Sequence, residues 1–307
     1  MEKITYGDWD RCYRLANDVV ELVVTADVGP RVIRFGFVDG ENQFWEDPAL
    51  LGHTGGDEWV NYGGHRLWHA PEARPRTYAP DNEPIRVDQV DGAARFTQPV
   101  EPTTGIEKSL ALRLDPDAAR VEVTHHLHNT NLWPVTLAPW ALSVMAPGGV
   151  GILPLSPRGA HEENLQPNTR LTLWAYTDMA DPRWTLGTRY VLLRQVPGAE
   201  TAQKVGTYAP QGWVAYARAG ALFVTTVTPE AGATYPDLGA NVELFTNADM
   251  LEVETLGPLA TLEPGADLAY VETWHLFDGV LQPQTEEDVV THVEPLVAPL
   301  VAGRSSA

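Results

Sequence analysis

The sequence predicts an all-β fold, a β-sandwich or a β-barrel, with few short helices. Apolar residues recur mostly at every second position, as in the segment from Arg120 to His128. The 26 glycines and 25 prolines are spread through the chain, where they break it into many short elements. Closely spaced strands with turn signals between them are typical of sandwiches and barrels.

Strands are expected wherever period-two segments are bounded by turn residues. These segments are Val19 to Val24, Arg31 to Val38, Ala94 to Thr97, Gly105 to Leu114, Arg120 to His128, Val135 to Met145, Arg189 to Val196, Gly212 to Ala217, Ala221 to Val227, Asn241 to Phe245, Met250 to Thr255 and Leu268 to Phe277.

Two segments are candidates for helices. Thr169 to Tyr176 is the weaker one. In Thr285 to Val293, Thr285 and Asp288 have the spacing of a capping box, and three valines form one apolar face. The sequence therefore predicts a C-terminal helical extension at about residues 285–302.

Composition limits the organisation of the protein and its partners. The 307 residues contain no linker-like stretch, so a single domain over residues 1–307 is expected. The net charge of −20 disfavours nucleic acid and anionic membranes as partners, and leaves small molecules as candidates. No signal peptide or membrane-spanning run is recognised, and the lone Cys12 allows no internal disulfide, so a cytoplasmic location is expected.

The segment from Asn61 to Glu72 is the first candidate site. It is opened by a Gly-Gly pair, closed by a proline, and interpreted as a loop. Its side chains of interest are His65, Arg66, Trp68, His69 and Glu72. Tryptophan faces stack on sugar C–H groups, and charged groups bind hydroxyls, so the segment suits carbohydrate binding. In the alternative interpretation, Trp68 is a core residue and His65 and Arg66 are solvated.

The segment from Met250 to Pro258 is the second candidate site. As a strand it places Glu252 and Glu254 together on one face. A charged face is usually solvated, and the pattern alone favours that interpretation. The alternative is a cleft, where a carboxylate with a raised pKa could serve as a general base.

Three histidines close together are the third candidate. His126 and His128 share a strand face with Glu122 and Thr124, and His125 lies on the opposite face. A His-x-His pair can bind a metal ion, but no carboxylate follows at close spacing, so no metal site is expected. A polar strand face, or a cleft wall with one histidine in use, remain as alternatives. Phosphate-binding and dinucleotide-binding motifs are absent, so no cofactor is expected.

Several of these segments resemble the aldose 1-epimerase (galactose mutarotase) family, over roughly residues 17 to 278. The resemblance rests on Val253-Glu254-Thr255, Leu262 to Gly265, the strand ending at Phe277, and Gly63-Gly64 through Pro71. It also includes Gly29 to Ile33. It implies a galactose mutarotase-like antiparallel supersandwich with a small sugar in a cleft. By the same resemblance Glu254 is the base, with Glu252 as its fallback.

The family's catalytic histidine has no counterpart, because Trp140 or Ala141 occupies its position. The acid is therefore expected to be His65, or else His126, with His69 and His128 as further candidates. The remaining expected substrate-binding residues are Arg66, Trp68, His69, Glu72, His128, Trp140 and Glu252. The sequence thus leaves two functions open: a cofactor-independent aldose 1-epimerase, and a non-catalytic carbohydrate-binding or sensing domain.

Overall fold

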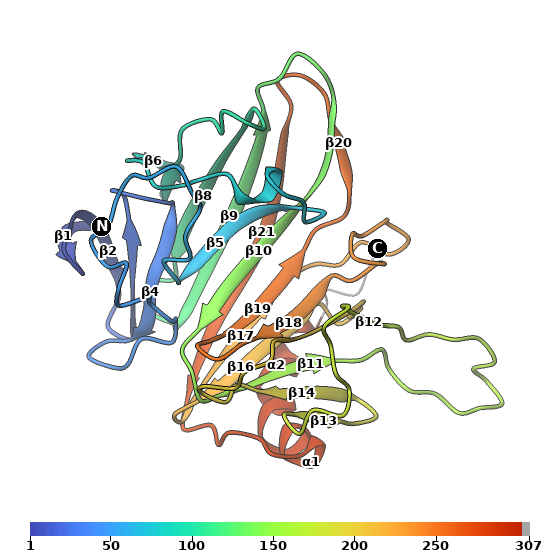
Figure 1. The fold of residues 1–307 in the computed structure, drawn as a ribbon. Helices are drawn as coiled ribbons and strands as arrows, with labels where there is room; N and C mark the ends of the chain where they lie inside the picture. Colours follow the sequence, from blue (N-terminus) through green and yellow to red (C-terminus); the bar gives the residue numbers. More distant parts are fainter. Residues whose placement is uncertain (303–307) are drawn as a thin grey trace. The chain divides into compact units, whose positions relative to one another are not determined.

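The computed structural model describes residues 1–302, and the chain in it divides into two compact units. Among these residues, unit 1 comprises Met1–Val144 and Leu259–His275, and unit 2 comprises Met145–Pro258 and residues 276–302. Both units are built almost entirely of antiparallel strands, as the ribbon in Figure 1 shows. The single domain expected over residues 1–307 stays a prediction.

Unit 1 contains two antiparallel sheets, which pack face to face because His65 of β5 meets His125 of β9 and Glu272 of β21. The first sheet has the order β1-β2-β3-β4-β5-β10, with β20 also paired to β10, and the second has the order β21-β9-β8-β7-β6. The strands are β1 (Glu2–Tyr6), β2 (Trp9–Ala16), β3 (Val20–Thr25), β4 (Arg31–Phe37), β5 (His65–Ala70), β6 (Arg86–Val90), β7 (Ala93–Thr97), β8 (Ile106–Leu114), β9 (Arg120–Asn129), β10 (Val135–Met145), β20 (Ala260–Leu262) and β21 (Asp267–Asp278). A 3₁₀ turn, Arg76–Tyr78, follows β5.

Unit 2 repeats this two-sheet arrangement and adds the C-terminal helical segment. Its sheets have the orders β19-β18-β15-β12 and β13-β14-β11-β16-β17. The strands are β11 (Val150–Pro154), β12 (Leu171–Leu173), β13 (Trp184–Leu186), β14 (Tyr190–Arg194), β15 (Gln203–Thr207), β16 (Trp213–Arg218), β17 (Ala221–Thr226), β18 (Val242–Thr246) and β19 (Leu251–Leu256). The helical segment consists of α1 (Glu286–Asp288), a π-helical turn (Val289–Val293) and α2 (Glu294–Val301).

The predicted all-β architecture is confirmed, and one predicted helix is wrong. Each strand expected from period-two alternation is present, with ends shifted by at most a few residues. The segment Thr169 to Tyr176 instead contains the short strand β12, which pairs with β15. Pairing along a sheet edge prevails here, because a helix of eight residues has little stability of its own.

The predicted Gly-Gly loop is also wrong in part, because His65–Ala70 form strand β5 and are buried throughout. Gly63 and Gly64 have φ angles of 91° and 69°, so the chain turns sharply just before the strand. A Cβ on Gly64 would lie 2.5 Å from the carbonyl oxygen of Val32. Two glycines are therefore required for the chain to enter the sheet at this point.

The C-terminal segment begins as the sequence predicted. Thr285 is the N-cap, and Thr285 and Asp288 form a reciprocal capping box. Val289, Val293 and Val297 then pack into an apolar cluster with strand residues of unit 2 such as Trp213. The helical segment thus covers one face of the sheet that contains β16, as Figure 1 shows for the red segment.

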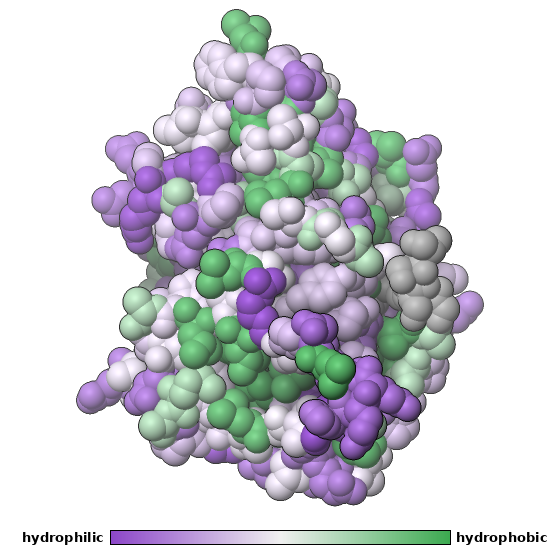
Figure 2. Space-filling view, turned by 90° about the vertical axis from the view of Figure 1, so that its right-hand side faces the viewer, coloured by the Kyte–Doolittle hydropathy of each residue, from purple (hydrophilic) through white to green (hydrophobic). Residues whose placement is uncertain are grey.

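Apolar side chains also reach the surface. Leu132 and Trp133 in unit 1 and Leu165 in unit 2 are exposed. Figure 2 shows apolar groups (green) interspersed with hydrophilic ones (purple) on one face. Scattered exposed apolar residues are normal, but Trp133 borders a pocket described below. None of the helices among residues 1–302 has the length and apolarity that a membrane crossing requires.

Candidate functional site

Strand β5 presents predicted site residues on both of its faces. It pairs with β10 so that Trp68 lies opposite Trp140 and His65 lies opposite Ser143. Because side chains alternate along a strand, Arg66 and Trp68 share one face, while His65 and His69 share the other. The second face points into the interior of unit 1, where His65 contacts His125 of the opposite sheet and His69 contacts Glu101 in the connection between β7 and β8.

Arg66, Trp68 and Trp140 form a buried cluster with two further aromatic residues. The Arg66 guanidinium lies 4.4 Å from the centre of the Trp68 ring and 5.3 Å from that of Trp59. The Trp68 ring is edge-on to Trp140 at 5.3 Å and to Tyr78 at 5.0 Å. These three residues pack against one another, and their expected contact with a sugar stays a prediction.

His65 lies in a fully buried cluster with His125 and Glu272. The two Nε2 atoms are 2.7 Å apart, and the Glu272 carboxylate lies 3.9 Å from His65 Nε2 and 3.8 Å from His125 Nε2. His65 Nδ1 contacts the Ser143 hydroxyl at 2.9 Å, and His125 Nδ1 donates to the Tyr270 carbonyl at 3.0 Å. Burial lowers the pKa of His125 to about 3 and lowers the pKa of His65 well below its usual value. Neutral imidazoles of this kind are poor proton donors to a sugar.

His69 belongs to a second polar cluster in the same interior. Its Nε2 lies 3.2 Å from Glu101, whose other carboxylate oxygen is 2.6 Å from the Lys108 ammonium. Its Nδ1 lies 2.7 Å from the Arg76 guanidinium. Because a guanidinium only donates, Nδ1 must accept, and the proton resides on Nε2, which donates to Glu101. His69 is thus a neutral tautomer with both nitrogens occupied.

The charges around His69 fix the protonation states of the cluster. Burial lowers the pKa of His69, although Glu101 opposes that shift. Burial acts to raise the pKa of Glu101, but the Lys108 ammonium and His69 outweigh it and bring the pKa to about 2. Glu101 is therefore ionised at neutral pH, and His69 is not an acid there.

A pocket of about 340 Å³ reaches His69 from one end of unit 1. Arg76 contributes a charge to its wall, and Trp133, 60% exposed, contributes an aromatic ring. The remaining lining residues are Pro75, Thr103, Thr104, Ile106, Asn131, Val135 and Leu137. We call this cavity the His69 pocket. It combines an aromatic ring with amide, hydroxyl and guanidinium groups, the usual composition of a small-molecule site.

Three further predicted residues lie outside this pocket. His126 and His128 alternate with the buried His125, as predicted, and are partly exposed. His128 pairs with Asp267 at 2.9 Å, and His126 lies 3.4 Å from Arg95. Glu72 is exposed and accepts a hydrogen bond from the Tyr78 hydroxyl.

The face of β19 that carries Glu252 and Glu254 is buried, so the solvated face favoured by the sequence pattern is wrong. Glu252 is 7% exposed and Glu254 is completely buried. The Lys204 ammonium, from β15, lies 2.8 Å from Glu254 and 2.8 Å from Glu243, which faces Glu254 across β18 and β19. The aromatic ring of Trp174 lies 4.6 Å from the same ammonium. The charge is buried here because a cation from β15 of the same sheet compensates it.

This Lys204 cluster, composed of Lys204, Glu243 and Glu254, has shifted proton affinities. Burial acts to lower the pKa of Lys204, but the two carboxylates raise it well above its usual value. Burial and the nearby Glu254 raise the pKa of Glu243 well above its usual value, although Lys204 opposes this. Two carboxylates around one ammonium thus favour retention of an extra proton on Glu243.

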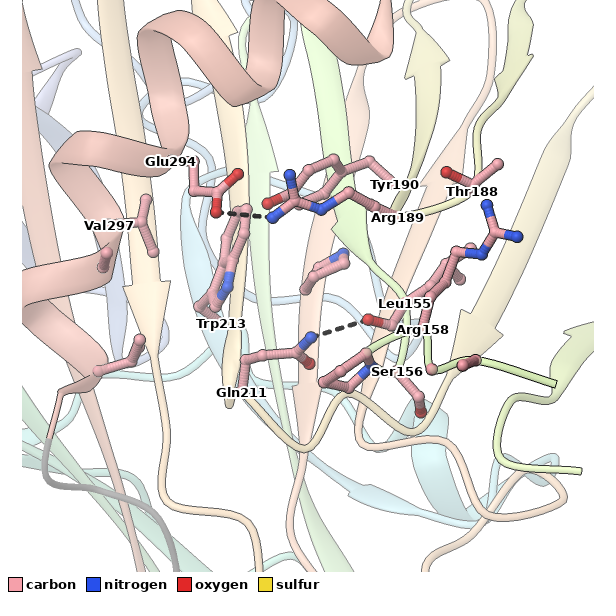
Figure 3. A pocket seen from close by; sticks show the side chains of 16 residues that line it. Leu155, Ser156, Arg158, Thr188, Arg189, Tyr190, Gln211, Trp213, Glu294 and Val297 are labelled. Atoms are coloured by element: carbon pink, nitrogen blue, oxygen red, sulfur yellow. Dashed lines mark hydrogen bonds and ion pairs between the residues drawn. The ribbon is translucent and has the colours of Figure 1, made fainter. Parts of the chain in front are cut away.

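Unit 2 contains a larger pocket, of about 720 Å³, shown in Figure 3. Tyr190 and Trp213 line it from the sheet, and Glu294 and Val297 line it from α2. The Glu294 carboxylate forms an ion pair with the Arg189 guanidinium at 2.6 Å. Glu254 lines neither this pocket nor the His69 pocket.

Comparison with solved structures identifies the architecture. A galactose mutarotase-like protein from Lactobacillus casei superposes with a TM-score of 0.53 over 87% of this chain and 100% of its own, at 11% identity. A galactose mutarotase related enzyme from Lactobacillus acidophilus gives 0.51 over 87% and 98%, also at 11% identity. The chain has the galactose mutarotase-like fold. The predicted supersandwich is thus confirmed at the level of fold, and the catalytic assignments stay predictions.

A TPR-domain containing protein from Parabacteroides distasonis gives a TM-score of 0.57 at 14% identity, over 88% of this chain and 48% of that one. The present chain therefore spans about half the length of that protein. No family model matches the sequence, and no curated protein matches it either. Identities this low establish the galactose mutarotase-like fold alone.

Sequence reasoning missed most partners of the predicted residues. Lys204, Glu243, Glu101, Lys108 and Glu272 were not proposed, although each is buried and charged. The sequence offers only weak signals for them, such as the charged residues Glu243 and Glu272 between apolar or β-branched neighbours. The signal is weak because the partners are distant in the sequence; Lys204 and Glu254, for example, are 50 residues apart.

Proposed function

We propose that this protein binds a carbohydrate in the His69 pocket. The observation that carries the proposal is Trp133, whose side chain is largely exposed where it borders a pocket with polar groups. An aromatic ring exposed at the edge of a pocket is available to stack against a ligand that enters it. A sugar ring offers a C–H face for the indole, and hydroxyls for the polar groups around it.

The chemistry of His69 favours binding over catalysis in this pocket. Its two nitrogens are engaged by Arg76 and Glu101, and its pKa is lowered. A neutral, hydrogen-bonded imidazole can orient a guanidinium or a hydroxyl, but it has no proton to give to a ring oxygen at neutral pH. The Arg76 guanidinium supplies a cation for an anionic sugar, in a chain whose net charge is −20.

The second candidate function is that of a cofactor-independent aldose 1-epimerase with Glu254 as base. The observation that favours it is the Lys204 cluster, in which Glu243, whose pKa is raised well above its usual value, lies beside Glu254. A protonated and an ionised carboxyl together provide the acid and the base that ring opening requires. In this candidate Glu243 is the general acid, the role that the sequence analysis gave to His65 or His126.

Calorimetric titration of the full chain with free hexoses and hexose 6-phosphates tests the first candidate. We expect a sugar of this panel to bind, and Trp133→Ala to weaken binding by about tenfold or more, which is about 1.4 kcal/mol of contact energy. Leu132→Ala is the matched control, because Leu132 is the adjacent exposed residue and does not line the pocket. Unchanged affinity in Trp133→Ala, or no binding at about 10 mM of any sugar, would overturn the proposal.

Magnetisation exchange between α and β anomers separates the two candidates. A binding protein leaves the anomer exchange rate at its spontaneous value. An epimerase raises it, and Glu254→Gln then lowers the catalysed rate by about 10²–10⁴-fold. Glu263→Gln is the matched control, because Glu263 is exposed. Acceleration that survives in Glu254→Gln would remove Glu254 as the base.

A further inference from the structure

His65, His125 and Glu272 form a buried cluster that takes no part in the proposed sugar site, because none of them lines the His69 pocket. Each residue offers one ligand atom, and the three atoms lie within 4.8 Å of one another. His65 comes from β5 in one sheet of unit 1, and His125 and Glu272 come from the neighbouring strands β9 and β21 in the other. The cluster therefore joins the two sheets in the interior of unit 1.

The distances leave room for one ion. The three ligand atoms are separated by 2.7, 3.8 and 3.9 Å. The circle through three points with these separations has a radius of about 2.1 Å, which is the length of zinc–nitrogen and zinc–oxygen bonds. A single point thus lies at bonding distance from both imidazoles and the carboxylate. The two nitrogens need to separate by about 0.6 Å to reach tetrahedral spacing.

The outer atoms of both imidazoles are already held in the way that metal-bound histidines require. His125 Nδ1 donates to the Tyr270 carbonyl, so its Nε2 carries a lone pair directed at the cluster. His65 Nδ1 contacts the Ser143 hydroxyl, whose oxygen can accept a hydrogen bond from Nδ1–H, so that the lone pair is on Nε2. Such partners fix the tautomer and the ring orientation of ligating histidines. The Trp274 indole donates to Glu272 at 2.9 Å and orients the carboxylate.

The donor set of the cluster also favours a cation. Glu272 is 1% exposed, and Phe35, Phe44 and Trp274 pack as an aromatic group beside the histidines. Two imidazoles with one carboxylate form a donor set that zinc occupies in proteins.

We propose that His65, His125 and Glu272 form a binding site for a divalent transition-metal ion, with zinc as the preferred ion. The site ties the two sheets of unit 1 together. The proposed metal site contains His125. It does not contain His126 or His128, the two members of the His-x-His pair in the sequence. It stands or falls independently of sugar binding.

Metal analysis of the full chain, purified from zinc-supplemented medium, tests the site. We expect about one zinc per chain, and fewer than about 0.1 per chain in His125→Asn and Glu272→Gln. His126→Asn and His128→Asn are the matched controls, because they lie on the same strand with the opposite orientation, and should retain the full zinc content. Equal zinc content in His125→Asn and in these controls would overturn the proposal.

Cobalt substitution of the wild-type chain keeps the test decisive if the core variants fail to fold. After removal of metal with a chelator, addition of Co²⁺ should produce visible absorption bands that saturate at about one equivalent, and Zn²⁺ should abolish them. Zn²⁺ should also raise the Tm of the metal-free wild type. Absence of the bands together with an unchanged Tm would show that the cluster holds protons alone and would refute the site.

Discussion

The ammonium of Lys204 lies 2.8 Å from the carboxylate of Glu254, and both side chains are buried inside unit 2. The same ammonium lies 2.8 Å from Glu243, so one cation serves two carboxylates. The residue that the sequence marked as a catalytic base is therefore part of a charged network on three adjacent strands. The consequences of this network for stability can be measured.

Replacement of Lys204 should destabilise the protein strongly. Lys204→Met leaves Glu243 and Glu254 buried beside one another without their cation, and breaking such a pair costs about 3–5 kcal/mol. Urea denaturation at pH 7 measures the loss. Lys3→Met is the control, because Lys3 is exposed. A loss below about 1 kcal/mol in Lys204→Met would show that the charged network contributes little to the free energy of unfolding.

Glu101 should make the stability of the protein depend on acid pH. Its pKa is lowered to about 2, so its contribution is fully present above the unfolded value near 4.5 and is lost as the pH falls towards about 2. The shift corresponds to a loss on the order of 3 kcal/mol. Chemical denaturation between pH 6 and pH 2 measures it.

Glu101→Gln provides the comparison for that measurement. The variant is less stable than the wild type at pH 6, because it leaves the Lys108 ammonium without the carboxylate 2.6 Å away. The difference between the two proteins should shrink as the pH falls towards 2. Parallel pH profiles for the variant and the wild type would contradict the assignment.

Gly64 should tolerate no side chain. Gly64→Ala places a Cβ 2.5 Å from the Val32 carbonyl oxygen at a φ of 69°, where backbone atoms cannot give way. We expect a loss of about 2–4 kcal/mol, more than the roughly 1 kcal/mol for a left-handed φ alone. Gly92→Ala is the matched control, with φ of 78° and nothing within 4 Å of its Cβ. Equal Tm values for the two variants would refute the steric argument.

The N-cap at Thr285 should stabilise the C-terminal helical segment. Its hydroxyl accepts from the Asp288 amide at 3.2 Å, and Asp288 accepts in turn from the Thr285 amide at 2.9 Å. Thr285→Ala removes one half of this box, and about 1 kcal/mol of unfolding free energy should be lost. Thr285→Ser preserves the hydroxyl and should restore most of that loss. Thermal unfolding of both variants provides the measurement.

The sequence by itself determined the strands and the orientation of their side chains. Alternation along β9 predicted that His125 faces away from His126 and His128, and spacing predicted the Thr285 capping box, because both depend on residues close together in the chain. The tertiary structure alone decided what each face meets. Glu254 is buried and not solvated because Lys204 lies beside it on the same sheet. His65 meets His125 and Glu272 because two sheets pack face to face, over sequence separations that local periodicity does not encode.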